Sequence, residues 1–385
     1  MTQPATAILD ALVGDSAYLA ELRAAKPEVF EQTQSAYDAL YRDQHAIGAA
    51  TLRGFAARVA AWHGVAPLFD LHVAAGADTT VIEGEVTDSE TQLLRDHLDI
   101  LAVSPALAAR DDIELLTGAG ISADDIVLVS QLVAFESYLA RAVYGFAALD
   151  DRTLGDQPTP ASTVRPNGRE KDLSGVTSSG DPKPVEFTRD VLQWQPWVAP
   201  IDTEDLTAEQ ADSFAAKTTT NSPYFRLLAR VPAVLKARSA LDNAVFLPRE
   251  GLPKAERELS AAVASKVNDC IYCASVHARK SATFSKRPDD VDRLLTIELE
   301  RDADWQPASV APLSDGQDAR WSAIVDAAAG LSLLRPQLRP DVLQRLRDLG
   351  LQTGELADLI AATAFFAWAN RLMLTLGEPT VPGTD

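Results

Sequence analysis

Apolar residues recur along most of this chain every three or four positions, the spacing that lines one face of an α-helix. Alanine, a strong helix former, is abundant in the same segments. The pattern predicts an all-α fold, with helices in the first half at 16–41, 47–63, 66–75, 88–102, 105–117 and 122–147. In the second half it predicts helices at 206–218, 222–229, 231–243, 253–267, 270–285, 288–298, 316–330, 338–348 and 353–376.

Local signals mark where two of these helices begin. Ser122 is followed by two aspartates in a capping-type entry, and Thr353 opens a later helix with Glu355 two residues on. Gly120 and Gly350 stand just before these starts and are predicted to end the preceding helices, because glycine readily adopts the left-handed conformation of a helix C-terminus. The same pair of helix end and start signals therefore occurs twice in the chain.

These repeated helix signals are part of a longer internal repeat of the sequence. From Pro27 onward residues match at an offset of 205, and further along they match at an offset of 230. The change predicts about 25 inserted residues in the second copy, between Arg279 and Leu349, including 305–307 and 312–316. The matched pairs are Pro27 with Pro232, Val29 with Val234, 56–57 with 261–262, His72 with His277, Asp125 with Glu355, Phe135 with Phe365, Tyr138 with Trp368 and Arg141 with Arg371.

The repeat predicts two helical domains, in a chain long enough for each to have its own core. Residues 1–150 form the first predicted domain and residues 186–385 the second. Residues 151–185 are rich in Pro, Gly, Ser, Thr and charged residues, which is typical of an exposed linker. The aromatic residues of the matched helices recur at helical spacing, so we interpret them as core or interface.

Charge and composition exclude several functions. The net charge of −20 argues against binding nucleic acid or an anionic membrane surface, because both would repel the protein. The first residues lack the basic and apolar regions of a secretory signal, and apolar stretches such as 359–369 are too short to span a bilayer. Since the chain has only two cysteines, we expect a reducing, cytoplasmic location.

The two cysteines, Cys270 and Cys273, are separated by two residues and are the main candidates for chemistry. On a helix His277 lies one turn after Cys273 on the same face, and Glu258 can reach the site from the preceding helix. A thiol with a nearby base, and a carboxylate that orients the base, is the arrangement of an activated nucleophile. The four residues therefore predict thiol redox chemistry.

The pattern Glu-x11-Cys-x2-Cys-x3-His resembles the active site of the alkylhydroperoxidase D-like branch of the carboxymuconolactone decarboxylase superfamily. Residues 221–226 resemble the upstream helix of its peroxidase-related members, and the resemblance covers about residues 187–375. It implies a tandem repeat of AhpD-like helical domains and an antioxidant, thiol-dependent hydroperoxide reductase. It further implies a dithiol reductant, no organic cofactor or metal, and assembly into a homo-oligomer.

Which cysteine attacks the peroxide is left open by the residues. Asn268 or Asp269 is expected to cap a helix that starts near Cys270, and the N-terminus of that helix would lower the pKa of the Cys270 thiol. The neighbouring His277 and the family resemblance instead favour Cys273 as the attacking thiol. Cys270 would then be the resolving thiol, which condenses with the sulfenic acid to give a disulfide.

Other interpretations of the dithiol are a zinc half-site, a decarboxylase and a redox sensor. Zinc usually takes four ligands, and there is no second CxxC. The decarboxylase branch of the superfamily acts on a carboxymuconolactone-type acid and does not depend on a CxxC. A non-enzymatic sensor or assembly protein would use the disulfide to change its packing. Tyr272 stands where the best-known family type has a histidine, so the proton relay is expected to be shorter here.

The first copy lacks most of this chemistry. Val65 and Leu68 occupy the cysteine positions and Arg53 the glutamate position, so only His72 remains. A site without thiols cannot form a disulfide. We therefore expect the first copy to be a degenerate domain that completes the assembly.

Overall fold

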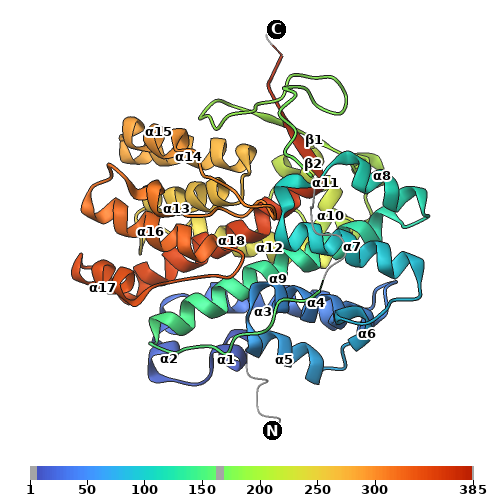
Figure 1. The fold of residues 1–385 in the computed structure, drawn as a ribbon, viewed down its shortest axis with the longest axis horizontal. Helices are drawn as coiled ribbons and strands as arrows, with labels where there is room; N and C mark the ends of the chain where they lie inside the picture. Colours follow the sequence, from blue (N-terminus) through green and yellow to red (C-terminus); the bar gives the residue numbers. More distant parts are fainter. Residues whose placement is uncertain (1–6, 162–168, 384–385) are drawn as a thin grey trace.

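The computed structural model describes residues 7–161 and 169–383, and helices make up nearly all of their regular structure (Figure 1). The first half contains α1 (Ile8–Val13), α2 (Ala17–Ala25), α3 (Pro27–Tyr41), α4 (Ala49–His63), α5 (Ala66–Ala74), α6 (Thr79–Ile82), α7 (Ser89–Val103), η1 (Pro105–Leu107), α8 (Arg110–Gly118) and α9 (Ala123–Leu149). The predicted all-α class is confirmed.

The second half begins with a short strand, β1 (Gln193–Pro196), and ends with another, β2 (Gly377–Thr380). Between them lie η2 (Thr203–Asp205), α10 (Ala208–Asp212), η3 (Lys217–Asn221), α11 (Pro223–Leu228), α12 (Pro232–Phe246), α13 (Lys254–Val267), α14 (Ile271–Ser285), α15 (Pro288–Thr296), η4 (Ala311–Ser314), α16 (Ala319–Ser332), α17 (Pro340–Asp348) and α18 (Thr353–Thr375).

The starts of matched helices follow the offsets found in the sequence. Helices α3 and α12 begin at residues 27 and 232, α4 and α13 at 49 and 254, and α5 and α14 at 66 and 271, each pair 205 apart. Helices α9 and α18 begin at 123 and 353, which are 230 apart. Gly120 and Gly350 both have positive φ, and the Ser122 side chain caps α9 as expected.

The two halves pack through their matched helices. Helix α9 lies along α18 in the middle of the molecule, and α3 packs on α12 (Figure 1). The Trp368 ring of α18 contacts Phe135 and Tyr138 of α9, with ring centroids 5.2 and 5.9 Å apart. One continuous apolar core therefore runs through both halves, and the aromatic residues lie at the interface between them.

Several predicted helices are shorter than the pattern suggested. The predicted helix 16–41 breaks at Lys26, because Pro27 has no N–H to donate to a preceding turn and instead starts α3. The predicted helix 105–117 is divided into the 3₁₀ turn η1 and α8, and 206–218 contains only the five residues of α10 as α-helix.

The prediction of helix throughout is wrong at β1 and β2. These strands pair antiparallel, with Gln193 opposite Thr380 and Pro196 opposite Gly377. Trp194 of β1 is buried and donates from its indole nitrogen to the Met373 carbonyl at 3.0 Å. The ladder therefore fixes the segment before the second copy to the end of α18.

The expectation that no apolar stretch could span a bilayer is also wrong as a statement of length. Helix α9 has 27 residues and is apolar enough to cross a membrane by length and composition. Its most apolar window is wholly buried inside the protein, because α9 is the central helix of the core. This burial is typical of the core helix of a soluble protein.

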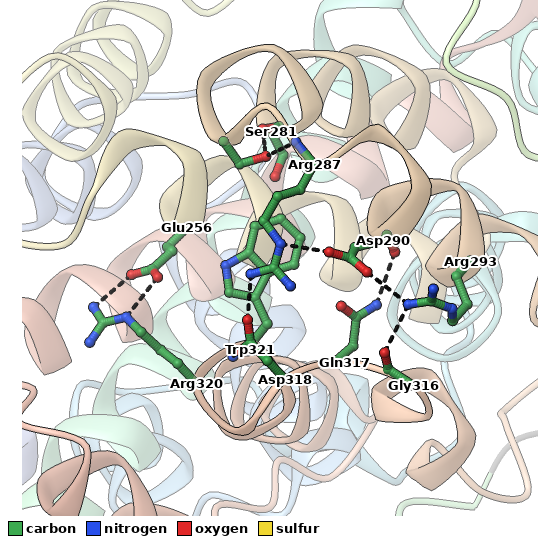
Figure 2. Close-up of polar contacts among 11 residues, drawn as sticks. Glu256, Ser281, Arg287, Asp290, Arg293, Gly316, Gln317, Asp318, Arg320 and Trp321 are labelled. Atoms are coloured by element: carbon green, nitrogen blue, oxygen red, sulfur yellow. Dashed lines mark hydrogen bonds and ion pairs between the residues drawn. The ribbon is translucent and has the colours of Figure 1, made fainter.

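A polar network holds α14 against its neighbours (Figure 2). Just after α14 the Arg287 guanidinium stacks 3.9 Å from the Trp321 ring of α16 and pairs with Asp318 at 2.7 Å. In the same turn of α16 Arg320 forms two hydrogen bonds to Glu256 of α13, at 2.7 and 2.8 Å. These contacts fix α14, which carries the dithiol, relative to α13 and α16.

Candidate functional site

Helices α13 and α14 bring the four predicted residues to one place. Helix α13 carries Glu258, and the chain then turns through Asp269, whose φ is +60°, before α14 begins. Cys270 itself is the N-cap residue of α14, so the expectation that Asn268 or Asp269 would cap this helix is wrong. Cys273 and His277 lie on the first two turns of α14.

The carboxylate of Glu258 holds the imidazole of His277. His277 Nδ1 lies 2.6 Å from Glu258 Oε2, and the glutamate is almost completely buried. An ionised carboxylate can only accept a hydrogen bond, so with Glu258 ionised Nδ1 carries the proton and Nε2 has a free lone pair. His277 is 14% exposed. The pair is therefore arranged as a base and its orienting group.

Two phenylalanines fix the plane of this imidazole. The His277 ring centroid lies 4.3 Å from that of Phe366 on α18 and 5.8 Å from that of Phe246 on α12, both in tilted or edge-on contact. Such packing restricts rotation of the ring, so Nε2 keeps one direction.

Both thiols are free and buried. The pKa of the Cys273 thiol is raised well above its usual range, first because it hydrogen-bonds to Cys270 and then because of burial. The positive charge of Arg238 opposes this shift. Cys273 therefore needs a base to ionise at neutral pH, and the oriented His277 lies one turn away on the same helix.

The dithiol lies between two cavities. Cys273 and His277 line a cavity of about 650 Å³ with walls from α11, α12, α14 and α18. Cys270 lines a smaller cavity of about 120 Å³, formed with η1, residues 170–172 and β2. Tyr272 lines both. The two cysteines therefore line different cavities.

The Asp269 side chain is held by partners outside α14. Its carboxylate pairs with Lys171 at 2.7 Å and accepts a hydrogen bond from the Trp305 indole at 2.8 Å. The negative charge is compensated there, rather than by backbone donors as the sequence suggested. Trp305 belongs to the predicted insertion, so the insertion contacts the residue that precedes the dithiol.

The part of the chain that contains the dithiol is similar to a known protein family. Residues 232–306, which contain all four predicted site residues, match the carboxymuconolactone decarboxylase family. The superfamily resemblance seen in the sequence is confirmed for this segment. Solved structures that match include the alkylhydroperoxidase AhpD core of an uncharacterized peroxidase-related protein from Ralstonia eutropha JMP134. It is 22% identical, with a TM-score of 0.35, and the match covers 47% of this chain and 88% of that one. No curated protein matches the chain.

The larger cavity is lined by further residues that the sequence patterns did not indicate. Arg238 and Asp242 of α12 line the larger cavity, as does Tyr224 of α11. One signal was available for Arg238, since it follows Val234 by four residues and Leu235 by three, where the apolar face of a helix should continue. Burial raises the pKa of Asp242 in the same cavity.

At the equivalent position, the first copy has a buried polar cluster. Arg53 Nη1 lies 3.2 Å from His72 Nδ1, and because arginine only donates, the His72 proton belongs on Nε2. Nε2 lies 3.3 Å from Glu136 Oε2 without forming a hydrogen bond, and Glu136 Oε1 accepts from the Tyr41 hydroxyl at 2.5 Å. Glu136 matches Phe366 at the offset of 230, and Tyr41 matches Phe246 at the offset of 205. The carboxylate beside the histidine therefore comes from a different helix in the first copy. The histidine proton is also on the other ring nitrogen.

No metal site is built from these groups. Among residues 7–161 and 169–383 no three His, Cys, Asp or Glu side chains are grouped closely enough to hold a metal ion. The geometry therefore gives the zinc interpretation of the CxxC no support.

The raised pKa of Cys273 predicts how its alkylation depends on pH. A raised pKa delays formation of the thiolate, so reaction with iodoacetamide should keep rising at pH values above about 8.5, where an ordinary thiol is half ionised. In Cys270→Ser the thiol partner is gone and the Cys273 profile should move to lower pH. Peptide mass spectrometry of Cys273 measures both profiles. An unmoved profile in Cys270→Ser would show that the two thiols are not coupled.

Proposed function

We propose that this protein is a thiol-dependent hydroperoxide reductase. The observation that supports this best is that His277 lines the same cavity as Cys273 while Glu258 holds its imidazole at 2.6 Å. Cys270 is close enough to affect the ionisation of Cys273. Nucleophile, base, orienting group and resolving thiol are therefore present together.

The proposed reaction takes three steps. His277 Nε2 takes the proton of the Cys273 thiol, and the thiolate attacks the terminal peroxide oxygen. An S–O bond forms as the O–O bond breaks, and the departing alkoxide takes the proton from His277 and leaves as an alcohol. The Cys270 thiol then displaces hydroxide from the sulfenic acid, giving a disulfide and water. An external dithiol reduces this disulfide and is itself oxidised to a disulfide.

Several features of the proposal follow the family resemblance rather than the geometry. The reductant is proposed to be a small dithiol or a dithiol protein, and the location is proposed to be the cytoplasm, where such reductants are kept reduced. A homo-oligomer is proposed because single-repeat relatives assemble through helical faces. The first copy is proposed to complete this assembly without catalysing the reaction.

The direct test measures consumption of an organic hydroperoxide with dithiothreitol as the reductant. The proposed function requires catalytic turnover, one alcohol for each oxidised dithiothreitol, and a Cys270–Cys273 disulfide after a peroxide pulse without reductant. If the disulfide forms but no turnover follows, the redox-sensor alternative is favoured. If neither occurs, the proposed function fails.

Removing the base or its orienting group should slow turnover in a pH-dependent way. We expect His277→Ala and Glu258→Gln to lose activity at neutral pH by about 10²- to 10⁴-fold, the usual contribution of acid–base catalysis. The loss should shrink at high pH, because the raised pKa of Cys273 is then exceeded without help. The pH profile of kcat/KM measures this, with His45→Ala as a control that removes a histidine outside the cavity. A loss that is equal at all pH values would indicate a structural role.

A further inference from the structure

Arg238 is a buried cation without a polar partner. It is 4% exposed, and two of its guanidinium nitrogens, Nε and Nη1, are buried with no hydrogen-bond partner. In the part of the chain that the structure describes, no carboxylate forms an ion pair with it. The charge of Asp242, one turn away, attracts it through space without a hydrogen bond to Nε or Nη1. Leaving charged N–H groups buried and unpaired costs free energy, so such a group calls for an explanation.

Aromatic rings surround this guanidinium but do not satisfy its N–H groups. The central carbon lies 5.1 Å from the Phe365 ring centroid, 5.6 Å from that of Tyr224 and 6.0 Å from that of Phe225. These contacts stabilise the charge through the ring faces. The Tyr224 hydroxyl is also buried and has no hydrogen-bond partner. Both unpartnered groups line the cavity that contains Cys273.

The fold itself does not require a cation at this position. At the offset of 205, Arg238 matches Thr33 of the first copy, which is completely buried. The Thr33 hydroxyl donates to the Val29 carbonyl at 2.7 Å and lies 2.6 Å from the Tyr138 hydroxyl, so it is fully satisfied. The same helix therefore packs well with a small polar residue where there is no dithiol. The unpaired arginine occurs only in the copy that has the thiols.

We propose that the cavity beside Cys273 binds a hydroperoxide that carries a carboxylate, with Arg238 and Tyr224 holding that carboxylate. The guanidinium and the phenol each supply an unpaired donor, and a carboxylate can accept a hydrogen bond from both. The remaining walls include Phe246, Phe366 and Met373, which suit an apolar body between the carboxylate and the peroxide. This inference rests on the proposed function and names its substrate class.

Binding at one end would orient the other. A carboxylate held by Arg238 on α12 leaves the apolar body to reach across the cavity to Cys273 and His277 on α14. The energy of the remote charge contact then places the O–O bond at the thiolate. Hydrogen peroxide and neutral hydroperoxides lack this contact. They are expected to be poorer substrates.

The test compares one hydroperoxide with and without its charge. Linoleic acid hydroperoxide and its methyl ester are assayed with dithiothreitol, and the readout is the ratio of kcat/KM for the acid to that for the ester. The wild-type ratio should exceed one. Arg238→Met should lower the ratio by about 10- to 100-fold, which corresponds to loss of a charge-assisted hydrogen-bonded contact. Arg238→Lys should restore part of it, and Tyr224→Phe should lower it by about 3- to 10-fold.

The matched control is Lys236→Met. It removes one positive charge from the same helix, but Lys236 is 64% exposed and outside the cavity, so the ratio should stay at the wild-type value. An equal loss for acid and ester in Arg238→Met would mean that the arginine acts on the thiol, and would overturn the inference. A wild-type ratio of one would overturn it too, even if Arg238→Met did not fold.

Binding of octanoate, followed by calorimetry, separates this inference from the proposed function. If octanoate binds the wild type but not Arg238→Met, and no hydroperoxide is reduced, the carboxylate site is supported and the proposed reductase activity is contradicted. If both hydroperoxides are reduced without preference, the proposed reductase activity is supported and the carboxylate site is contradicted.

Discussion

Replacing Cys273 by serine is expected to abolish hydroperoxide reduction, with a loss of about a thousandfold or more, as is usual when a nucleophile is removed. A serine hydroxyl in this cavity stays protonated and is a poor nucleophile toward an O–O bond. His277 would still be oriented by Glu258, so the loss would report the sulfur itself. Dithiothreitol-dependent peroxide consumption measures the effect.

Cys270→Ser should give a different result, which identifies the attacking thiol. Without a resolving thiol, one peroxide equivalent should leave a sulfenic acid at Cys273 that dimedone traps and mass spectrometry locates. Ser275→Ala is the matched control on the same helix, since its hydroxyl donates to the Tyr272 carbonyl one turn back. It should keep turnover. Wild-type turnover in Cys273→Ser, or dimedone trapping at Cys270 in that variant, would reverse the roles of the thiols.

The helical fold could be predicted well because both copies carry the same local signals. The offsets of 205 and 230 reproduce the helix starts, and Gly120 and Gly350 end their helices with positive φ. The strands β1 and β2 could not be predicted, because their pairing joins Gln193 to Thr380, and no local pattern reports a contact across so much of the chain. The break at Lys26 was visible in Pro27, but the apolar period continued through it and decided the prediction.

The candidate site was only partly accessible from the sequence. Spacing along α13 and α14 was enough to join Glu258 to His277, because consecutive antiparallel helices place such residues side by side. Phe366, Arg238 and Tyr224 come from three other helices. Their positions depend on how α11, α12 and α18 pack, which a pattern within one helix does not encode.

The packing of the two halves leads to the largest expected effect on stability. The Trp368 side chain is completely buried, and its indole nitrogen donates to Gln131 Oε1 of α9 at 2.8 Å. Its ring meets Phe135 and Tyr138 of α9 as well as Phe365 of its own helix. One side chain thus fills the centre of the contact between the copies and donates to the buried carbonyl oxygen of Gln131.

Trp368→Ala is therefore expected to lower the free energy of unfolding by about 3–5 kcal/mol, because it opens a large cavity and leaves the Gln131 carbonyl oxygen without its donor. Urea unfolding followed by circular dichroism measures the loss. Trp368→Phe should lose less, since it keeps most of the ring contacts. The control Leu115→Ala removes an apolar side chain that is 59% exposed on α8, and should change the free energy by no more than about 0.5 kcal/mol. A Trp368→Ala loss as small as that of the control would mean that the two copies hold together elsewhere, and that the α9–α18 contact is not the centre of a shared core.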